Sequence, residues 1–201
     1  MPNPCGKNLQ TWNRPQKGRE RMKDICLAPV PPEELPNFSR HLQEAFGVAL
    51  REKFGVQEEI PSAQEIRRCY QARGEQTHHL LWRGRRVGGA MLRIDPAGGR
   101  NALDLFFISP AYHSQGLGLA AWRAIEAAYP DTVVWETITP YFEERNIHFY
   151  VNKCGFHIVE FFNPHHLDPN LPPPTDSNGD PIPGEETYFR FEKVMRPEAM
   201  R

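Results

Sequence analysis

The sequence has no long apolar run, no excess of either charge and few cysteines. No apolar stretch approaches the roughly 18 residues of a membrane-spanning helix, so we expect no membrane segment. The 24 lysines and arginines nearly balance the 25 aspartates and glutamates, whereas nucleic-acid binders usually carry a basic excess. We therefore expect no nucleic-acid partner. The 4 cysteines include no Cys-x-x-Cys pair, which argues for thiols in a reducing compartment.

The first 23 residues lack the apolar segment of a signal peptide, so we expect a cytoplasmic protein. Lysines and arginines outnumber acidic residues in this stretch, which predicts a disordered basic tail over residues 1–23. Apolar residues make up 39% of the 201 residues, enough to fill a core. The length predicts that residues 24–201 form a single domain.

Proline is the residue in excess, with 20 copies against a typical share of roughly 5%. Only five of them lie between Asn37 and Asn163, an ordinary density. Because proline removes a backbone donor and restrains φ, this distribution predicts a folded middle with irregular flanks. The stretch 163–186 is predicted to be a proline-rich acidic loop, either a functional lid or a mobile segment before the last strand.

The hydrophobic pattern predicts an α/β fold with a mixed twisted sheet flanked by helices, antiparallel at first and parallel in a later βαβ centre. Strands are expected at residues 25–28, 79–82, 87–94, 103–108, 132–135, 156–159 and 187–194. Helices are expected after the Pro31–Glu34 entrance, after a capping box of Ser62 and Glu65, from Leu119 to Tyr129, and from an N-cap at Thr139 to Gly155. We expect the run 132–135 to be a buried parallel strand.

The segment from Ile108 to Leu119 is the most informative part of the chain. An apolar strand ends, a short loop follows, and Gly116-x-Gly118 opens a helix. Glycines allow close approach of the backbone to a bulky anion, and the start of a helix offers N–H groups without intrahelical partners. This arrangement predicts diphosphate binding.

The same glycines also fit a dinucleotide-binding pattern, because Gly116 to Ala121 matches G-x-G-x-x-A and Glu136 follows 20 residues after Gly116. Two features argue against this alternative. Seven residues separate the strand from the first glycine, and the chain after Phe162 lacks the further βαβ units that such a domain needs.

The run Ile-Ser-Pro-x-Tyr-His-Ser-Gln-Gly-Leu-Gly-Leu-Ala resembles the acyl-CoA-binding signature of the GNAT superfamily of N-acetyltransferases. The run Asn146-Ile-His-Phe-Tyr followed by Gly155-Phe156 resembles its second signature. The sequence departs from the family pattern twice. His113 stands where the family has Gln or Arg, and Val151 stands where its tyrosine usually lies, so that Tyr150 is one residue early. In an α-helix such an offset turns a side chain by about 100°.

The resemblance implies transfer of an acetyl group from acetyl-CoA to a primary amine by direct attack in a ternary complex. It implies pantetheine contacts from the backbone of the strand before the loop, diphosphate contacts from the loop, and further cofactor contacts from the second signature. The expected cofactor-binding residues are Phe106, Phe107, Ile108, His113, Ser114, Gln115, Gly116, Leu117, Gly118, Leu119, Asn146 and Phe149.

Three residues are the candidates for catalysis. Glu136 ends an apolar strand and is the preferred general base, with a structural strand-end carboxylate that binds Thr137, Thr139 or a nearby arginine as the alternative. Asp104 interrupts an apolar strand and either contacts substrate or faces solvent. Tyr150 is a candidate acid for the leaving thiolate, but it shares a helical stripe with Ile147, Val151 and Cys154, which equally fits a core tyrosine.

No metal is expected, because the pair His165-His166 beside Asp168 lacks a further ligand at suitable spacing, and the 176–180 segment departs from a calcium loop. The resemblance implies a small-molecule or peptide amine as acceptor, and its identity and a homodimeric state are left open. A non-catalytic acyl-CoA-binding protein is the alternative function, since it would keep the diphosphate loop without needing Glu136.

Overall fold

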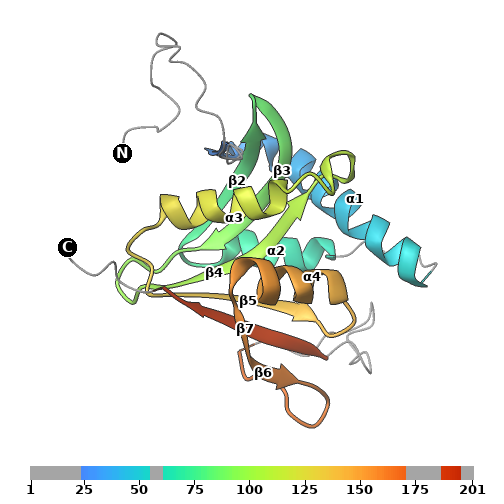
Figure 1. Ribbon diagram of the computed structural model, residues 1–201, viewed down its shortest axis with the longest axis vertical. Helices are drawn as coiled ribbons and strands as arrows, with labels where there is room; N and C mark the ends of the chain where they lie inside the picture. The colour runs from blue at the N-terminus through green and yellow to red at the C-terminus, as the bar shows by residue number, and fades with distance from the viewer. Residues whose placement is uncertain (1–23, 55–60, 171–186, 196–201) are drawn as a thin grey trace, which may run out of the picture. The chain divides into compact units, whose positions relative to one another are not determined.

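The computed structural model of the chain describes residues 24–54, 61–170 and 187–195, and for residues 49–54 the backbone alone. Seven strands form one mixed sheet in the order β1-β2-β3-β4-β5-β7-β6 (Figure 1). The strands are β1 Ile25–Pro29, β2 Glu75–Trp82, β3 Arg85–Arg93, β4 Arg100–Ile108, β5 Val134–Pro140, β6 His157–Phe162 and β7 Tyr188–Val194. β4 and β5 are parallel, whereas β1–β2, β5–β7 and β6–β7 are antiparallel. The predicted mixed α/β fold is confirmed.

The helices connect these strands as the sequence pattern predicts, with one exception given below. They are α1 Leu35–Phe54, α2 Ala63–Gln71, α3 Leu117–Ala128 and α4 Glu144–His148, which continues into a π-helical turn over Phe149–Cys154. Short 3₁₀ turns cover Pro32–Glu34 before α1 and Pro110–Tyr112 before α3. No helix in these described ranges is long and apolar enough to cross a membrane.

The chain divides into two compact units, which interleave along the sequence. In the described ranges the first comprises residues 24–71, 76–91 and 106–130, and the second comprises residues 72–75, 92–105 and 131–195. The predicted single domain over 24–201 stays a prediction. The basic tail, the 171–186 part of the proline-rich loop and its 176–180 segment lie outside the described residues.

The first unit has helices on both faces of its strands. Alternate residues of β2 point to opposite faces, because side chains alternate along a strand. On one face His79 meets Phe38 of α1, with ring centroids 5.8 Å apart. On the other face Leu80 is fully buried in a cluster with Leu117 and Ala121 of α3. Phe38 and Leu42 are buried one helical turn apart, as the apolar spacing of α1 predicts.

The second unit contains β5, β7 and β6 with α4. β5 and β7 pair over seven residues, from Val134 with Val194 to Pro140 with Tyr188. An aromatic cluster joins α4 to these strands, because the ring of Tyr150 lies 5.6 Å from Phe156 and 5.7 Å from Phe191. Gly155, in the left-handed region at φ 80°, ends the helical segment as predicted.

The predicted helix start at Thr139 is wrong. Thr139 and Pro140 are the last residues of β5, paired with Phe189 and Tyr188, and α4 begins only at Glu144. Thr139 followed by Pro140 is a local signal for the start of a helix. Pairing with the antiparallel strand β7 instead continues β5 through both residues. In the run 132–135, predicted to be a buried parallel strand, Val134 and Trp135 are buried and pair in parallel with β4, whereas Val133 is 54% exposed.

The capping box predicted at Ser62 and Glu65 is confirmed and gives a test of the fold. The Ser62 N–H donates to Glu65 Oε2 at 2.7 Å, and the Glu65 N–H donates to Ser62 Oγ at 3.2 Å. We expect Ser62→Ala to lower the free energy of unfolding by about 1 kcal/mol, because it removes the acceptor for an N–H of the first turn. Thermal unfolding of both single variants and of the double variant with Glu65→Ala measures this. Because the two residues cap each other, the double variant should lose less than the sum of the singles; strict additivity would contradict this reciprocity.

Candidate active site

The loop between β4 and α3 is held at its start by a histidine. His113 Nε2 lies 2.7 Å from the carbonyl oxygen of Ile108, the last residue of β4. Since a carbonyl only accepts, the imidazole donates its Nε2–H, and Nδ1 of the neutral ring then carries no hydrogen. Backbone bonds from Tyr112 to Ser109 and from His113 to Pro110 close the turn. His113 therefore anchors the loop to the end of the strand.

The second half of the loop presents backbone N–H groups at the start of α3. Ser114 and Gly116 are both in the left-handed region, at φ 59° and 73°. The Ala120 N–H donates to the Gly116 carbonyl, so the N–H groups of the residues between them precede the helical hydrogen-bond ladder. Gly116 is exposed, and a Cβ there would meet nothing within 4 Å. An anion can approach this backbone directly, as expected for a phosphate site at a helix N-terminus.

Strand β4 changes the direction of its backbone groups along its length. The carbonyl of Leu103 accepts a hydrogen bond at 2.8 Å from the Thr137 hydroxyl on β5, whereas the Ser109 N–H donates at 2.8 Å to Val87 on β3. Residues of the same parity bond to the same neighbour in a regular strand. Leu103 and Ser109 have the same parity but bond to opposite neighbours, so the alternation breaks between them, as in a β-bulge.

This break directs the N–H groups of Phe106 and Ile108 away from β3. In addition, the pairing of β4 with β5 covers three residue pairs and stops at Ala102 and Glu136, although β5 continues to Pro140. The last residues of β4 thus present N–H groups on the side away from β3, where a ligand's carbonyl could accept them.

Asp104 and Glu136 lie in a network of charged side chains within the second unit. Arg93 Nη2 is 3.2 Å from Asp104 Oδ1 and 3.8 Å from Glu136 Oε1. Arg100 Nη2 is 3.4 Å from Glu136 Oε2 and also pairs with Glu192. The carboxylate of Glu136 therefore has two arginine neighbours at long distances, and its side chain is 26% exposed.

Asp104 is the more buried of the two acids. Burial raises the pKa of its carboxyl above the usual value, and the charge of Glu136 adds to this, while Arg93 acts in the opposite direction. The network continues across β7 to β6, because Arg190 pairs with both Glu192 and Glu160. Among the described residues no group of three His, Cys, Asp or Glu could hold a metal ion.

The π-helical turn changes the position of Tyr150. The Gly155 N–H donates to the Tyr150 carbonyl, five residues earlier, instead of the four of an α-helix. One extra residue is thereby accommodated between Tyr150 and Gly155. In the sequence Tyr150 lies five residues before Gly155 instead of four, and the π-helical turn compensates for this difference. The Tyr150 side chain therefore lies on the helix face that a residue four before Gly155 would occupy in an α-helix.

The Tyr150 hydroxyl is buried and hydrogen-bonded to the Thr137 side chain. Burial raises the pKa of Tyr150 well above its usual range. Because Thr137 donates its own proton to the Leu103 carbonyl, it accepts that of Tyr150. Asn146 and Phe149 are half-buried on the same helical segment.

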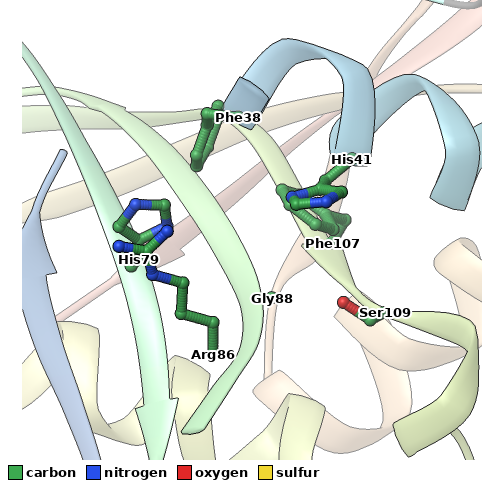
Figure 2. A pocket seen from close by; sticks show the side chains of 7 residues that line it. All are labelled: Phe38, His41, His79, Arg86, Gly88, Phe107 and Ser109. Carbon is green, nitrogen blue, oxygen red and sulfur yellow. The ribbon is translucent and has the colours of Figure 1, made fainter. Parts of the chain in front are cut away.

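A pocket of about 170 Å³ lies in the first unit beside the start of the loop (Figure 2). It is lined by Phe38, His41, His79, Arg86, Gly88, Phe107 and Ser109. Of these only Phe107 was predicted to belong to the site. The polar residues come from α1, β2, β3 and the position just after β4, and the sequence pattern gave no signal that joins them.

Comparison with known proteins identifies the family. A model described as the acetyltransferase (GNAT) family matches residues 40–156, more than half of the chain. The chain belongs to the GNAT family of acetyltransferases. A curated relative, the uncharacterized protein YrkN of Bacillus subtilis, is 48% identical over 190 residues, covering 94% of this chain and 98% of the relative.

Solved GNAT structures share the fold. The ribosomal-protein-S18-alanine N-acetyltransferase of Escherichia coli gives a TM-score of 0.59 at 15% identity, over 89% of this chain and 99% of that one. A Bacillus subtilis acetyltransferase in complex with CoA gives 0.56 at 15% identity, over 87% and 99%. A GNAT acetyltransferase of Elizabethkingia anophelis with acetyl-CoA bound gives 0.56 at 13% identity, over 85% and 98%.

In this GNAT chain the predicted site residues fall into two groups. The strand-end and loop residues from Phe106 to Leu119 are together in the first unit. Asp104, Glu136, Asn146, Phe149 and Tyr150 are in the second unit. Family membership removes the dinucleotide-binding alternative for Gly116 and Gly118. The sequence pattern allowed for an arginine near Glu136 but did not single out Arg93 and Arg100, the partners of the two acids.

The raised pKa of Asp104 gives a test by pH. An acid whose pKa is raised by folding loses stability as pH rises from its unfolded toward its folded pKa. We expect Asp104→Asn to be more stable than the parent at pH 8, on the order of 1 kcal/mol or about 2–4 °C, and the difference to vanish toward pH 4. Thermal unfolding between pH 4 and 8 measures it, with Asp131→Asn at an exposed aspartate as control. A variant less stable than the parent at pH 8 would mean that the Arg93 contact outweighs burial.

Proposed function

We propose that this GNAT chain transfers an acetyl group from acetyl-CoA to a primary amine by direct attack in a ternary complex. The observation that carries the proposal is the loop between β4 and α3, where Ser114 and Gly116 adopt left-handed conformations and the exposed Gly116 directly precedes α3. Membership of the GNAT family supports acetyl transfer as the reaction.

The diphosphate of the co-substrate is bound by the backbone from Ser114 to Leu119, with Gln115 exposed beside it. His113 acts by positioning, because its Nε2–H is directed to Ile108. The pantetheine arm hydrogen-bonds the N–H groups of the last residues of β4, and Asn146 and Phe149 contact the same arm. CoA and acetyl-CoA in two structures of this fold support this choice of co-substrate.

The reaction requires the amine to lose a proton, the carbonyl oxygen to be stabilised and the thiolate to leave. We assign proton removal to Glu136, and Asp104 influences it through the shared Arg93. The amine nitrogen attacks the acetyl carbon while N–H groups at the end of β4 stabilise the developing oxyanion. The carbon–sulfur bond then breaks, and the Tyr150 hydroxyl, after turning away from Thr137, donates its proton to the thiolate.

A cytoplasmic location stays a prediction, as does a homodimer. The non-catalytic acyl-CoA binder stays the alternative function. Measured turnover distinguishes the two functions, because the binder and the enzyme would both bind acetyl-CoA but only the enzyme would transfer the acetyl group.

Glu136→Gln tests the base. We expect kcat to fall by about 10²-fold or more with acetyl-CoA affinity nearly unchanged, because glutamine cannot accept the proton. Thiol release against a panel of amines and calorimetric titration with acetyl-CoA provide the two measurements. Glu192→Gln is the matched control, because it removes a carboxylate bound to the same Arg100 without removing the base. Equal turnover in both variants would remove Glu136 from catalysis.

Tyr150→Phe tests the acid. We expect kcat to fall about tenfold with an unchanged KM for the amine, a modest loss because a thiolate leaves readily. Steady-state thiol release from pH 6 to 10 measures it. Tyr141→Phe, at a tyrosine that is 52% exposed, is the control. Full activity of Tyr150→Phe would make Tyr150 a packing residue of the aromatic cluster.

A further inference from the structure

The pocket in the first unit has walls of unusual composition. Two aromatic rings, Phe38 and Phe107, pack edge to face with centroids 5.5 Å apart. The other side chains are a guanidinium, two imidazoles and a hydroxyl, so none of the seven lining residues carries a carboxylate. In Figure 2 His79 and Arg86 lie on one side of the space, and His41, Phe107 and Ser109 lie on the other. An ammonium group would find no opposite charge on these walls.

His79 enters the pocket as a neutral ring. Its side chain is 8% exposed, and burial lowers its pKa below the usual value. Nε2 lies 2.9 Å from Glu34 Oε2, and because a carboxylate only accepts, Nε2 carries the hydrogen. Glu34, which is not one of the lining residues, therefore fixes the tautomer of His79.

Arg86 is the one permanent charge among the lining residues. Its Nη2 contacts both oxygens of Glu34, at 2.9 and 2.7 Å. Within the described part of the chain its Nε and Nη1 donate no hydrogen bond, and the side chain is half exposed. A guanidinium presents five N–H groups in a planar fork, so one edge can bind Glu34 while the other binds a second carboxylate.

We propose that this pocket binds the carboxylate of the acceptor, so that the substrate class is an amine that also carries a carboxylate, such as an amino acid. Arg86 donates to the carboxylate, the Ser109 hydroxyl is a second donor, and Phe38 and Phe107 contact the adjoining carbons. A cavity of about 150 Å³ holds a benzene-sized molecule, so only this end of the acceptor enters. The amine then extends toward the loop that begins at Ser109. This inference rests on the proposed acetyl transfer and names its acceptor.

Matched acceptors test the proposal. Thiol release is measured at saturating acetyl-CoA with amino acids and with their carboxamides, which differ only in the charged group. We expect kcat/KM to favour the acid of at least one pair by about tenfold or more. Arg86→Gln should bring that ratio close to one, and Arg86→Lys should restore part of it. Arg85→Gln, at the exposed neighbouring arginine of β3, should keep the ratio. A parent protein without preference in any pair, or an Arg86→Gln variant with the parental ratio, overturns the proposal.

Glu34→Gln separates binding from a structural role of the ion pair. This variant removes the competing carboxylate but keeps Arg86 and an acceptor for His79, so carboxylate affinity should rise several-fold. If the pair only stabilised the fold, Glu34→Gln and Arg86→Gln would weaken binding alike, and the proposal would fail.

Direct binding separates this proposal from the proposed function. N-acetyl amino acids and their carboxamides are titrated calorimetrically without acetyl-CoA, in the parent, Arg86→Gln and Arg85→Gln proteins. Binding of the acids that depends on Arg86, without acetylation of any amine, would refute acetyl transfer and retain the carboxylate pocket. Acetyl transfer without a preference for acids, together with equal binding of acids and carboxamides, would refute the pocket and retain the reaction.

Discussion

The end of β4 is the structural constraint on which the candidate site depends. Its Leu103 carbonyl is directed to β5, whereas the N–H of Ser109 just after the strand is directed to β3. Its last carbonyl is occupied by His113, whose hydrogen bond starts the loop that leads into α3. Together with the backbone hydrogen bonds of Tyr112 and His113, this bond fixes the start of the loop that contains Ser114 and Gly116. The same strand end contributes Phe107 and Ser109 to the pocket.

Charge is distributed differently in the two units of this chain. The acids of the second unit alternate with arginines across neighbouring strands, so each carboxylate has a cationic neighbour. In the first unit the pocket instead presents a guanidinium, with its one acidic partner, Glu34, behind the wall. The acids suit proton removal from an amine, and the guanidinium suits recognition of an anion.

Much of the fold could be predicted because its signals are local. The capping box at Ser62, the proline entrance to α1 and the glycine stop at Gly155 each act within one helical turn, and all three occur as expected. The Thr139–Pro140 signal is equally local, yet it was wrong because β7 extends β5 through it. Local propensity is decisive only where no long-range partner competes with it.

The sequence by itself determined the family, the mixed sheet and the loop that opens α3, because glycine spacing and hydrophobic alternation are properties of short segments. Only the tertiary structure decided the partners of the acids and the walls of the pocket. Arg93 reaches Glu136, and Glu34 reaches both His79 and Arg86, across distances in sequence that no pattern encodes. The tertiary structure also decided the position of Tyr150. In the π-helical turn the direction of a side chain no longer follows from its sequence spacing as it does in a regular α-helix.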